Sequence, residues 1–329
     1  MFSSDVIWRI LFLFQICIGF MGNSLLFMLY MFIFLNQNQP TKPIDLICVH
    51  VTLLNVLAII FRLLPHLVSS FGVSHFLDDV SCKAILFTYR VTWGLSICTT
   101  SLLSAFQAIT ISPSNSKWVW LKSKISTSIY PSFLSFWILN VLIYVHLIKS
   151  VKAYHNFTLV DSDYVTHYCQ TKQFEHHHFI AYTTTIIIRD LLFVVLMMWS
   201  SVYTVNRLYK HHQRSQHLHS PSLSSQSSPE IKATHTILLL ISCFIFYYFS
   251  DNFVAYFLFH TPEKNLQLER MTAMISSCYP TICPFVLMRN NKIVSKWTSS
   301  LLKMRIIFSW NAFNTRCYPQ LPMAAEEPL

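Results

Sequence analysis

Hydrophobic residues form seven long runs along this chain, separated by short polar stretches. The runs cover about residues 7–35, 44–70, 82–110, 125–148, 179–206, 232–260 and 266–288. Each has about 20 residues or more, the length that a helix needs to cross a bilayer core roughly 30 Å thick. Strings such as HTILLLISCFIFYYF do not alternate polar and apolar residues, as the strands of a membrane barrel would. The pattern therefore predicts an all-α membrane protein built as a seven-transmembrane-helix bundle.

The composition agrees with this prediction. Of the 329 residues, 53% are hydrophobic and 12% are charged, whereas a soluble domain has about 25% charged residues. The first run begins close to the first Met and has neither a basic leader nor a small-residue cleavage site. We therefore expect it to be retained as a membrane helix and not removed as a signal peptide.

Basic residues indicate the orientation of the bundle. If the N-terminus lies outside, Lys and Arg at the inner helix ends outnumber those at the outer ends by roughly two to one, which fits the positive-inside rule. We thus predict a transmembrane domain over residues 1–290 and a cytoplasmic tail over 291–329, with an amphipathic helix at 291–308. The net charge of +10 is then a basic rim that faces anionic lipid, and no nucleic acid partner is needed to explain it.

The most polar internal stretch is HHQRSQHLHSPSLSSQSSPE, residues 211–230, which we predict to be the third cytoplasmic loop. Its histidines match no ordered ligand spacing, and no cysteine lies among them. We expect neither a metal site nor another cofactor there.

The cysteines predict one disulfide. Most of the nine lie inside hydrophobic runs or in the tail, where a free thiol is expected. Cys82, at the outer end of the third helix, and Cys169, in the second outer loop, both face the oxidising compartment, so we expect them to pair. The same loop holds the chain's one glycosylation sequon, at Asn156, on the side where glycosylation takes place.

Seven helices, this disulfide and a basic inner rim together suggest a G-protein-coupled receptor. The general rhodopsin-like motifs are missing, however. The third helix ends in LLSAFQAITISP (residues 102–113) without an Asp-Arg-Tyr triplet, and the seventh ends in YPTICPFVL (residues 279–287).

Those two segments and the run SPEIKATHTILLLISCFIFYYFSD (residues 228–251) resemble the type-1 vomeronasal receptors, as do the Cys82/Cys169 pair and the Asn156 sequon. The resemblance covers nearly the whole chain. It implies a chemosensory receptor of the plasma membrane, not an enzyme, that binds a small pheromone-like molecule and activates a Gi/Go-type heterotrimeric G protein. Trp93 departs from the family, in which a basic residue is usual, and this puts signalling by this chain in question.

The ligand is expected inside the helical bundle, because few residues precede the first helix. Charged residues inside a membrane are costly and usually face the bundle interior. Several charged and tyrosine residues lie at similar depth in the outer half: Arg62, Tyr89, Arg90, Arg189, Asp190, Tyr247, Tyr248 and Asp251. They form either a structural network, with aspartates paired to arginines, or a ligand site. Three arginines against two aspartates would favour an acidic or sulfated ligand.

Basic residues at the inner helix ends are candidate contacts for the G protein, although membrane anchoring explains such residues equally well. They are Lys117, Lys122, Lys124, Arg207, Lys210, Arg214 and Lys232.

Three other classes of protein fit the sequence less well. A bitter taste receptor also lacks the Asp-Arg-Tyr triplet, but the disulfide pair and the SPEIKATHTILLL run argue against it. A secondary transporter should show internal repeats and an interrupted helix pair, and the chain has four glycines and no visible repeat. An intramembrane hydrolase would need a motif such as HExxH or GxSxG, which is absent.

Overall fold

The structure, a computed structural model, describes residues 2–36, 43–73, 77–113, 119–153, 162–165, 169–172, 176–218, 229–260 and 266–289. All structural statements below concern these residues.

Seven long helices make up the body of the molecule. They are α1 (Phe2–Asn36), α2 (Pro43–Ser70), α3 (Asp79–Ile111), α4 (Val119–Tyr144), α6 (His176–Leu218), α7 (Pro229–His260) and α8 (Leu266–Arg289). Each contains a segment long and apolar enough to cross a membrane. The short helix α5 (Leu147–Ser150) continues the fourth segment after a turn. The predicted fold class, a bundle of seven membrane-spanning helices, is therefore confirmed.

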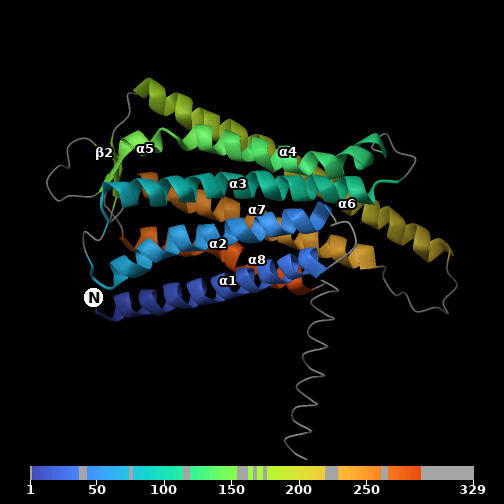
Figure 1. Cartoon of the computed structure of the whole chain (residues 1–329), viewed down its shortest axis with the longest axis horizontal. Helices are drawn as coiled ribbons and strands as arrows, with labels where there is room; N and C mark the ends of the chain where they lie inside the picture. Colours follow the sequence, from blue (N-terminus) through green and yellow to red (C-terminus); the bar gives the residue numbers. More distant parts are fainter. Residues whose placement is uncertain are drawn as a thin grey trace, which may run out of the picture.

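The seven helices run side by side along the long axis of the molecule, alternating in direction (Figure 1). One end of the bundle holds the starts of α1, α3, α6 and α8 and the ends of α2 and α7, together with the Cys82–Cys169 disulfide. We call it the disulfide end, and the other the opposite end. Helix α3 is buried along most of its length and therefore positions side chains from several neighbouring helices.

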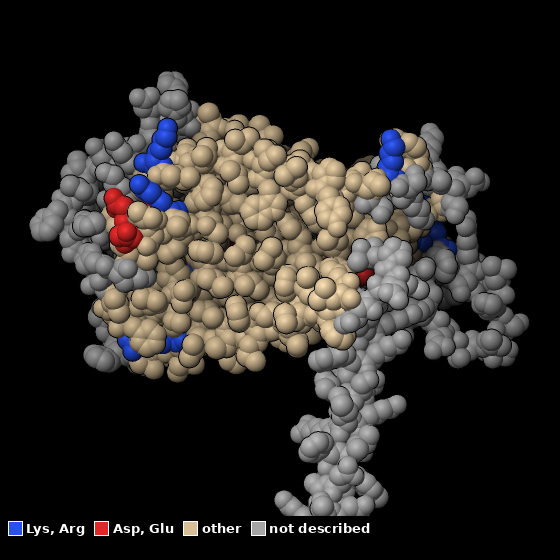
Figure 2. Space-filling view, in the orientation of Figure 1, with Lys and Arg blue, Asp and Glu red and all other residues tan. Residues whose placement is uncertain are grey.

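Apolar side chains cover the outside of the bundle as well as its core. Large hydrophobic residues such as Leu191, Leu192 and Trp199 on α6 are mostly exposed. Figure 2 shows Lys, Arg, Asp and Glu near the two ends of the face in view, with a broad uncharged band between them. Such a band is the surface that a helical bundle presents to lipid acyl chains.

A small antiparallel sheet was not predicted from the sequence. Its strands are β1 (Val151–Ala153), β2 (Ser162–Val165) and β3 (Cys169–Lys172), in the order β1-β3-β2. Three or four residues are too few for a reliable alternating pattern, so the strands carry no clear sequence signal.

The predicted loop at 211–230 is partly wrong. Residues 211–218 continue helix α6, and α7 begins at Pro229. Outside the apolar segment, residues such as Gln and Arg still favour helix, and Pro is well tolerated at the first helical position. The remaining loop residues, the predicted amphipathic helix at 291–308 and the Asn156 sequon lie outside the described residues.

Candidate ligand site

Arg189 and Asp190 on α6 form the centre of a buried polar network. Two guanidinium nitrogens of Arg189, Nε and Nη2, donate to Asp190 Oδ1 at 2.8 and 2.6 Å. Arg189 also donates to Asn140 Oδ1 at 2.7 Å and to the Tyr144 hydroxyl at 3.1 Å. The second carboxylate oxygen of Asp190 accepts from the Tyr248 hydroxyl at 3.1 Å. The pair is thus neutral overall, and hydrogen bonds from α4 and α7 offset its desolvation.

Gly94 on α3 makes room for this network. A Cβ atom at this position would overlap the side chains of Asn140 and Arg189. The glycine therefore allows the backbone of α3 to approach the place where the guanidinium meets the Asn140 amide. Neither Gly94 nor Asn140 was among the predicted site residues. The sequence does offer a signal for both, because the chain has four glycines and Asn140 is a polar residue inside an apolar run.

A second polar cluster joins α2, α3, α7 and α8. The guanidinium of Arg62 lies 4.8 Å from the ring centroid of Tyr89, and its Nε donates to Ser276 Oγ at 3.2 Å. Asp251 lies within electrostatic range of both Arg62 and Arg90. One of its carboxylate oxygens, Oδ1, is buried and has no hydrogen-bond partner among the described residues. This cluster therefore retains an unused acceptor, whereas both oxygens of Asp190 are engaged.

Trp93 lies between the two clusters. Its ring centroid is 6.4 Å from that of Tyr89 and 6.3 Å from that of Tyr248, on which it stacks. Tyr248 in turn donates to Asp190. The structure thus divides the predicted single layer into two groups that an aromatic side chain separates. Tyr247, also predicted for the layer, packs against the main hydrophobic core.

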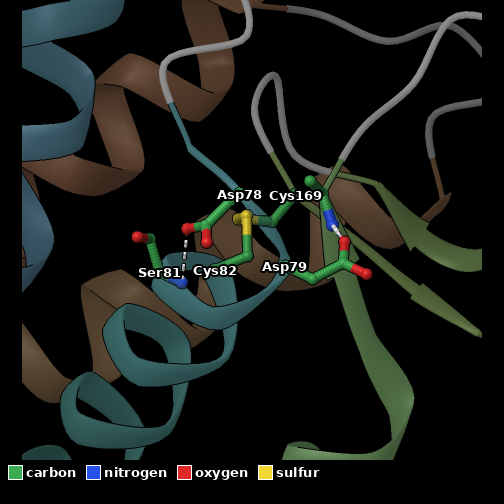
Figure 3. Close-up of a disulfide and its surroundings, with 6 residues drawn as sticks. Asp78, Asp79, Ser81, Cys82 and Cys169 are labelled. Carbon is green, nitrogen blue, oxygen red and sulfur yellow. Dashed lines mark hydrogen bonds between the residues drawn. A yellow bond between two sulfur atoms is a disulfide. The ribbon is translucent and has the colours of Figure 1, made fainter.

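The connection between α5 and α6, which carries the three strands, is fixed to α3 by the Cys82–Cys169 disulfide, whose cysteines are 87 residues apart in sequence. As Figure 3 shows, two aspartates flank this bond. Asp79 accepts a hydrogen bond from the backbone N–H of Ala153 in β1, and Asp78 caps α3 by accepting from the backbone N–H of Ser81. Hydrogen bonding to Ser81 holds the pKa of Asp78 below its usual range. The disulfide and the sheet together tie this connection to the start of α3.

At the opposite end, hydrogen bonds connect α3 to its neighbours. Arg207 Nε donates to the Tyr203 hydroxyl at 3.1 Å, which lies 2.9 Å from Ser112 Oγ. Ser112 Oγ also lies within hydrogen-bond distance of Ala108 O, and in its contact with Tyr203 either hydroxyl can be the donor. Gln107 on α3 donates to Thr234 on α7. The Nε group of Arg207 is therefore engaged in a hydrogen bond within α6.

Two other predicted basic residues lie at the surface of this end. Lys210 is exposed, and Lys124 lies 4.4 Å from the ring centroid of Trp120. Lys122, Arg214 and Lys232 belong to α4, α6 and α7, and Lys117 lies outside the described residues.

Comparison with known proteins assigns this architecture to a family. Residues 6–300 match the family described as "Vomeronasal organ pheromone receptor family". Vomeronasal type-1 receptor 2 of Homo sapiens is 34% identical over 278 residues, which cover 84% of this chain and 70% of that receptor. Vomeronasal type-1 receptor 40 of Mus musculus is 32% identical over 91% of this chain and 96% of its own length. Vomeronasal type-1 receptor 94 of Rattus norvegicus is 34% identical over 88% of both chains. With seven membrane-spanning helices and a family match over nearly its whole length, the chain belongs to the type-1 vomeronasal pheromone receptors, a family of multi-pass G-protein-coupled receptors and not of enzymes.

Proposed function

We propose that this chain is a chemosensory receptor that binds a small pheromone-like molecule between α2, α3, α7 and α8, near the disulfide end. Ligand binding there activates a Gi/Go-type heterotrimeric G protein at the opposite end. The observation that carries the placement is the convergence of Arg62, Tyr89 and Asp251 from three helices, with one buried acceptor still open. Buried polar groups without partners are rare in folded proteins and concentrate at functional sites.

The disulfide supports an extracellular position for this end. Disulfides form and persist in the oxidising compartment, and the Asn156 sequon lies in the same connection. The N-terminus of α1 is then extracellular, the tail is cytoplasmic, and the receptor acts at the plasma membrane. This orientation directs Lys117, Lys122, Lys124, Arg207, Lys210, Arg214 and Lys232 toward the cytoplasm, where a G protein docks.

The charge distribution favours an anionic ligand. Arg189 and Asp190 neutralise each other at 2.6 Å, so neither contributes net charge to the site. The remaining members, Arg62 and Arg90 against Asp251, leave one excess positive charge in a low-dielectric region. A small carboxylic acid or sulfate ester would offset this charge, and we place its anionic group beside Arg62 and Arg90.

A G-protein activation assay in membranes that express the chain tests this placement. Steroidal, volatile and sulfated small molecules are applied to the wild-type receptor and to its Arg62→Leu and Arg90→Leu variants. Loss of a charge-assisted hydrogen bond should reduce the potency of an anionic agonist at least about tenfold. Arg9→Leu is the matched control, because Arg9 bonds to Ser70 O beside Phe71 at the surface of the same end. Equal potency on all four receptors would contradict the anionic placement.

A Trp93→Arg variant belongs in the same assay. Trp93 stacks on Tyr248 between the two clusters, at a position where the resemblance described under Sequence analysis leads us to expect a basic residue. A response of the wild-type chain shows that the tryptophan is compatible with signalling. A response of the Trp93→Arg variant alone would show that this chain is disabled at Trp93.

A further inference from the structure

Asp251, a half-buried residue on α7, differs from the buried Asp190 on α6 in its hydrogen bonding. Asp190 Oδ1 accepts from Arg189 and Asp190 Oδ2 accepts from Tyr248. By contrast, Asp251 Oδ1 is buried and accepts no hydrogen bond within the part of the chain that the structure describes. A carboxylate oxygen away from water is costly to leave unsatisfied. The open acceptor therefore calls for a donor that the described residues do not supply.

The surroundings of Asp251 restrict the charge of that donor. Arg62 and Arg90 both act electrostatically on its carboxylate, and the Arg62 guanidinium is held in place over Tyr89 and by Ser276. A ligand ammonium would enter the field of two guanidinium groups at low dielectric, where like charges repel strongly. A hydroxyl group donates a hydrogen bond without this repulsion.

We propose that Asp251 recognises a hydroxyl group of the ligand, so that the receptor prefers small alcohols, neutral or anionic, over their ethers and amines. The carboxylate reaches the hydroxyl by turning about its terminal torsion, which has a broad energy minimum. Tyr248, three residues earlier on α7, is engaged by Asp190 and stacks on Trp93, so its hydroxyl does not serve Asp251. This inference rests on the ligand site proposed above and adds the chemistry of a second contact to it.

The test uses purified full-length receptor in lipid nanodiscs and a panel of cyclic terpene and steroid alcohols. Each alcohol is paired with its methyl ether, its deoxy hydrocarbon and its primary amine. Dissociation constants come from the shift of the thermal unfolding temperature with probe concentration, and G-protein nucleotide exchange is measured in parallel. Four proteins are compared: wild type, Asp251→Leu, Asp251→Asn, and the control Asp5→Asn, which changes a carboxylate that pairs with Arg270 at the disulfide end.

The expected result is at least one alcohol that wild type binds about ten- to a hundredfold more tightly than its ether and amine. Asp251→Leu should abolish this preference, Asp251→Asn should keep part of it through the amide oxygen, and Asp5→Asn should keep all of it. The inference is overturned if no alcohol in the panel is preferred, if the amine is preferred, or if the preference survives in Asp251→Leu. A hydroxyl preference without nucleotide exchange would leave the inference standing and refute the signalling function instead. If an alcohol drives nucleotide exchange equally in wild type and Asp251→Leu, the signalling function stands and the hydroxyl contact to Asp251 is refuted.

Discussion

At the scale of single residues, Gly94 decides whether the Arg189 network can form. Its position on α3 leaves space where a side chain would overlap Asn140 and Arg189. Overpacking of a closely packed interior costs about 1–3 kcal/mol. We therefore expect Gly94→Ala to lower the free energy of unfolding of the purified receptor by about that amount. Gly72→Asn is the control, because Gly72 has nothing within 4 Å and a φ of +80° that asparagine tolerates. Unchanged stability of Gly94→Ala would show that the network is not confined by α3.

The Arg189–Asp190 pair allows a second prediction at this scale. Replacing one partner leaves the other charge buried, which costs about 3–5 kcal/mol, whereas replacing both with apolar residues is often close to neutral. Arg189→Leu and Asp190→Leu should each destabilise the receptor strongly, and the double variant should be more stable than either. Equilibrium unfolding in a defined lipid environment measures the three values. Additive losses would mean that the two side chains act independently.

The individual contacts of these residues could not be predicted from the sequence. Membrane depth identified Arg62, Arg189, Asp190 and Asp251 as members of one layer, since depth follows from counting along each helix. It did not indicate that Arg189 pairs with the next residue, because adjacent helical positions do not face each other. Arg189 Nε and Nη2 both donate to Asp190, while Nη1 donates to Asn140 and Nη2 donates also to Tyr144, both on α4.

At the scale of elements, the disulfide fixes the connection between α5 and α6 to the start of α3. It links cysteines 87 residues apart, and the loss of loop-closure entropy in the unfolded chain corresponds to about 4–5 kcal/mol of stabilisation. The Cys82→Ser/Cys169→Ser receptor should therefore unfold at a clearly lower temperature than wild type under non-reducing conditions. Cys17→Ser, at an exposed thiol on α1, is the control. Equal unfolding temperatures for all three proteins would contradict a stabilising role of the bond.

The helices were predictable from the sequence to different extents. Long apolar runs gave all seven membrane segments, because the bilayer imposes both their length and their composition. The ends were less certain: α1 begins at Phe2 and α6 continues to Leu218, since hydropathy does not record helix that extends into water. The three strands beside the disulfide depend on the tie between β3 and α3, a tertiary constraint with little local signal.

At the scale of the whole molecule, we place the proposed ligand site at one end of the bundle and the G protein at the other. The uncharged band in Figure 2 separates the charged ends, and α3 runs between them with hydrogen bonds to α6 and α7 near the opposite end. A ligand that alters the contacts of α3 and α7 near Tyr89 and Asp251 therefore acts on helices that also reach the opposite end, where we propose that the G protein docks.

The coupling between ligand and G protein is tested by ligand-dependent nucleotide exchange, measured with purified receptor in lipid nanodiscs and purified Gi/Go- and Gs-type heterotrimers. We expect a small anionic or hydroxylated agonist to accelerate exchange on the Gi/Go-type protein well above its effect on Gs. We also expect Arg62→Leu to shift the agonist response to higher concentration. A molecule that binds tightly at the proposed site between α2, α3, α7 and α8, yet accelerates exchange on neither G protein, would contradict this coupling.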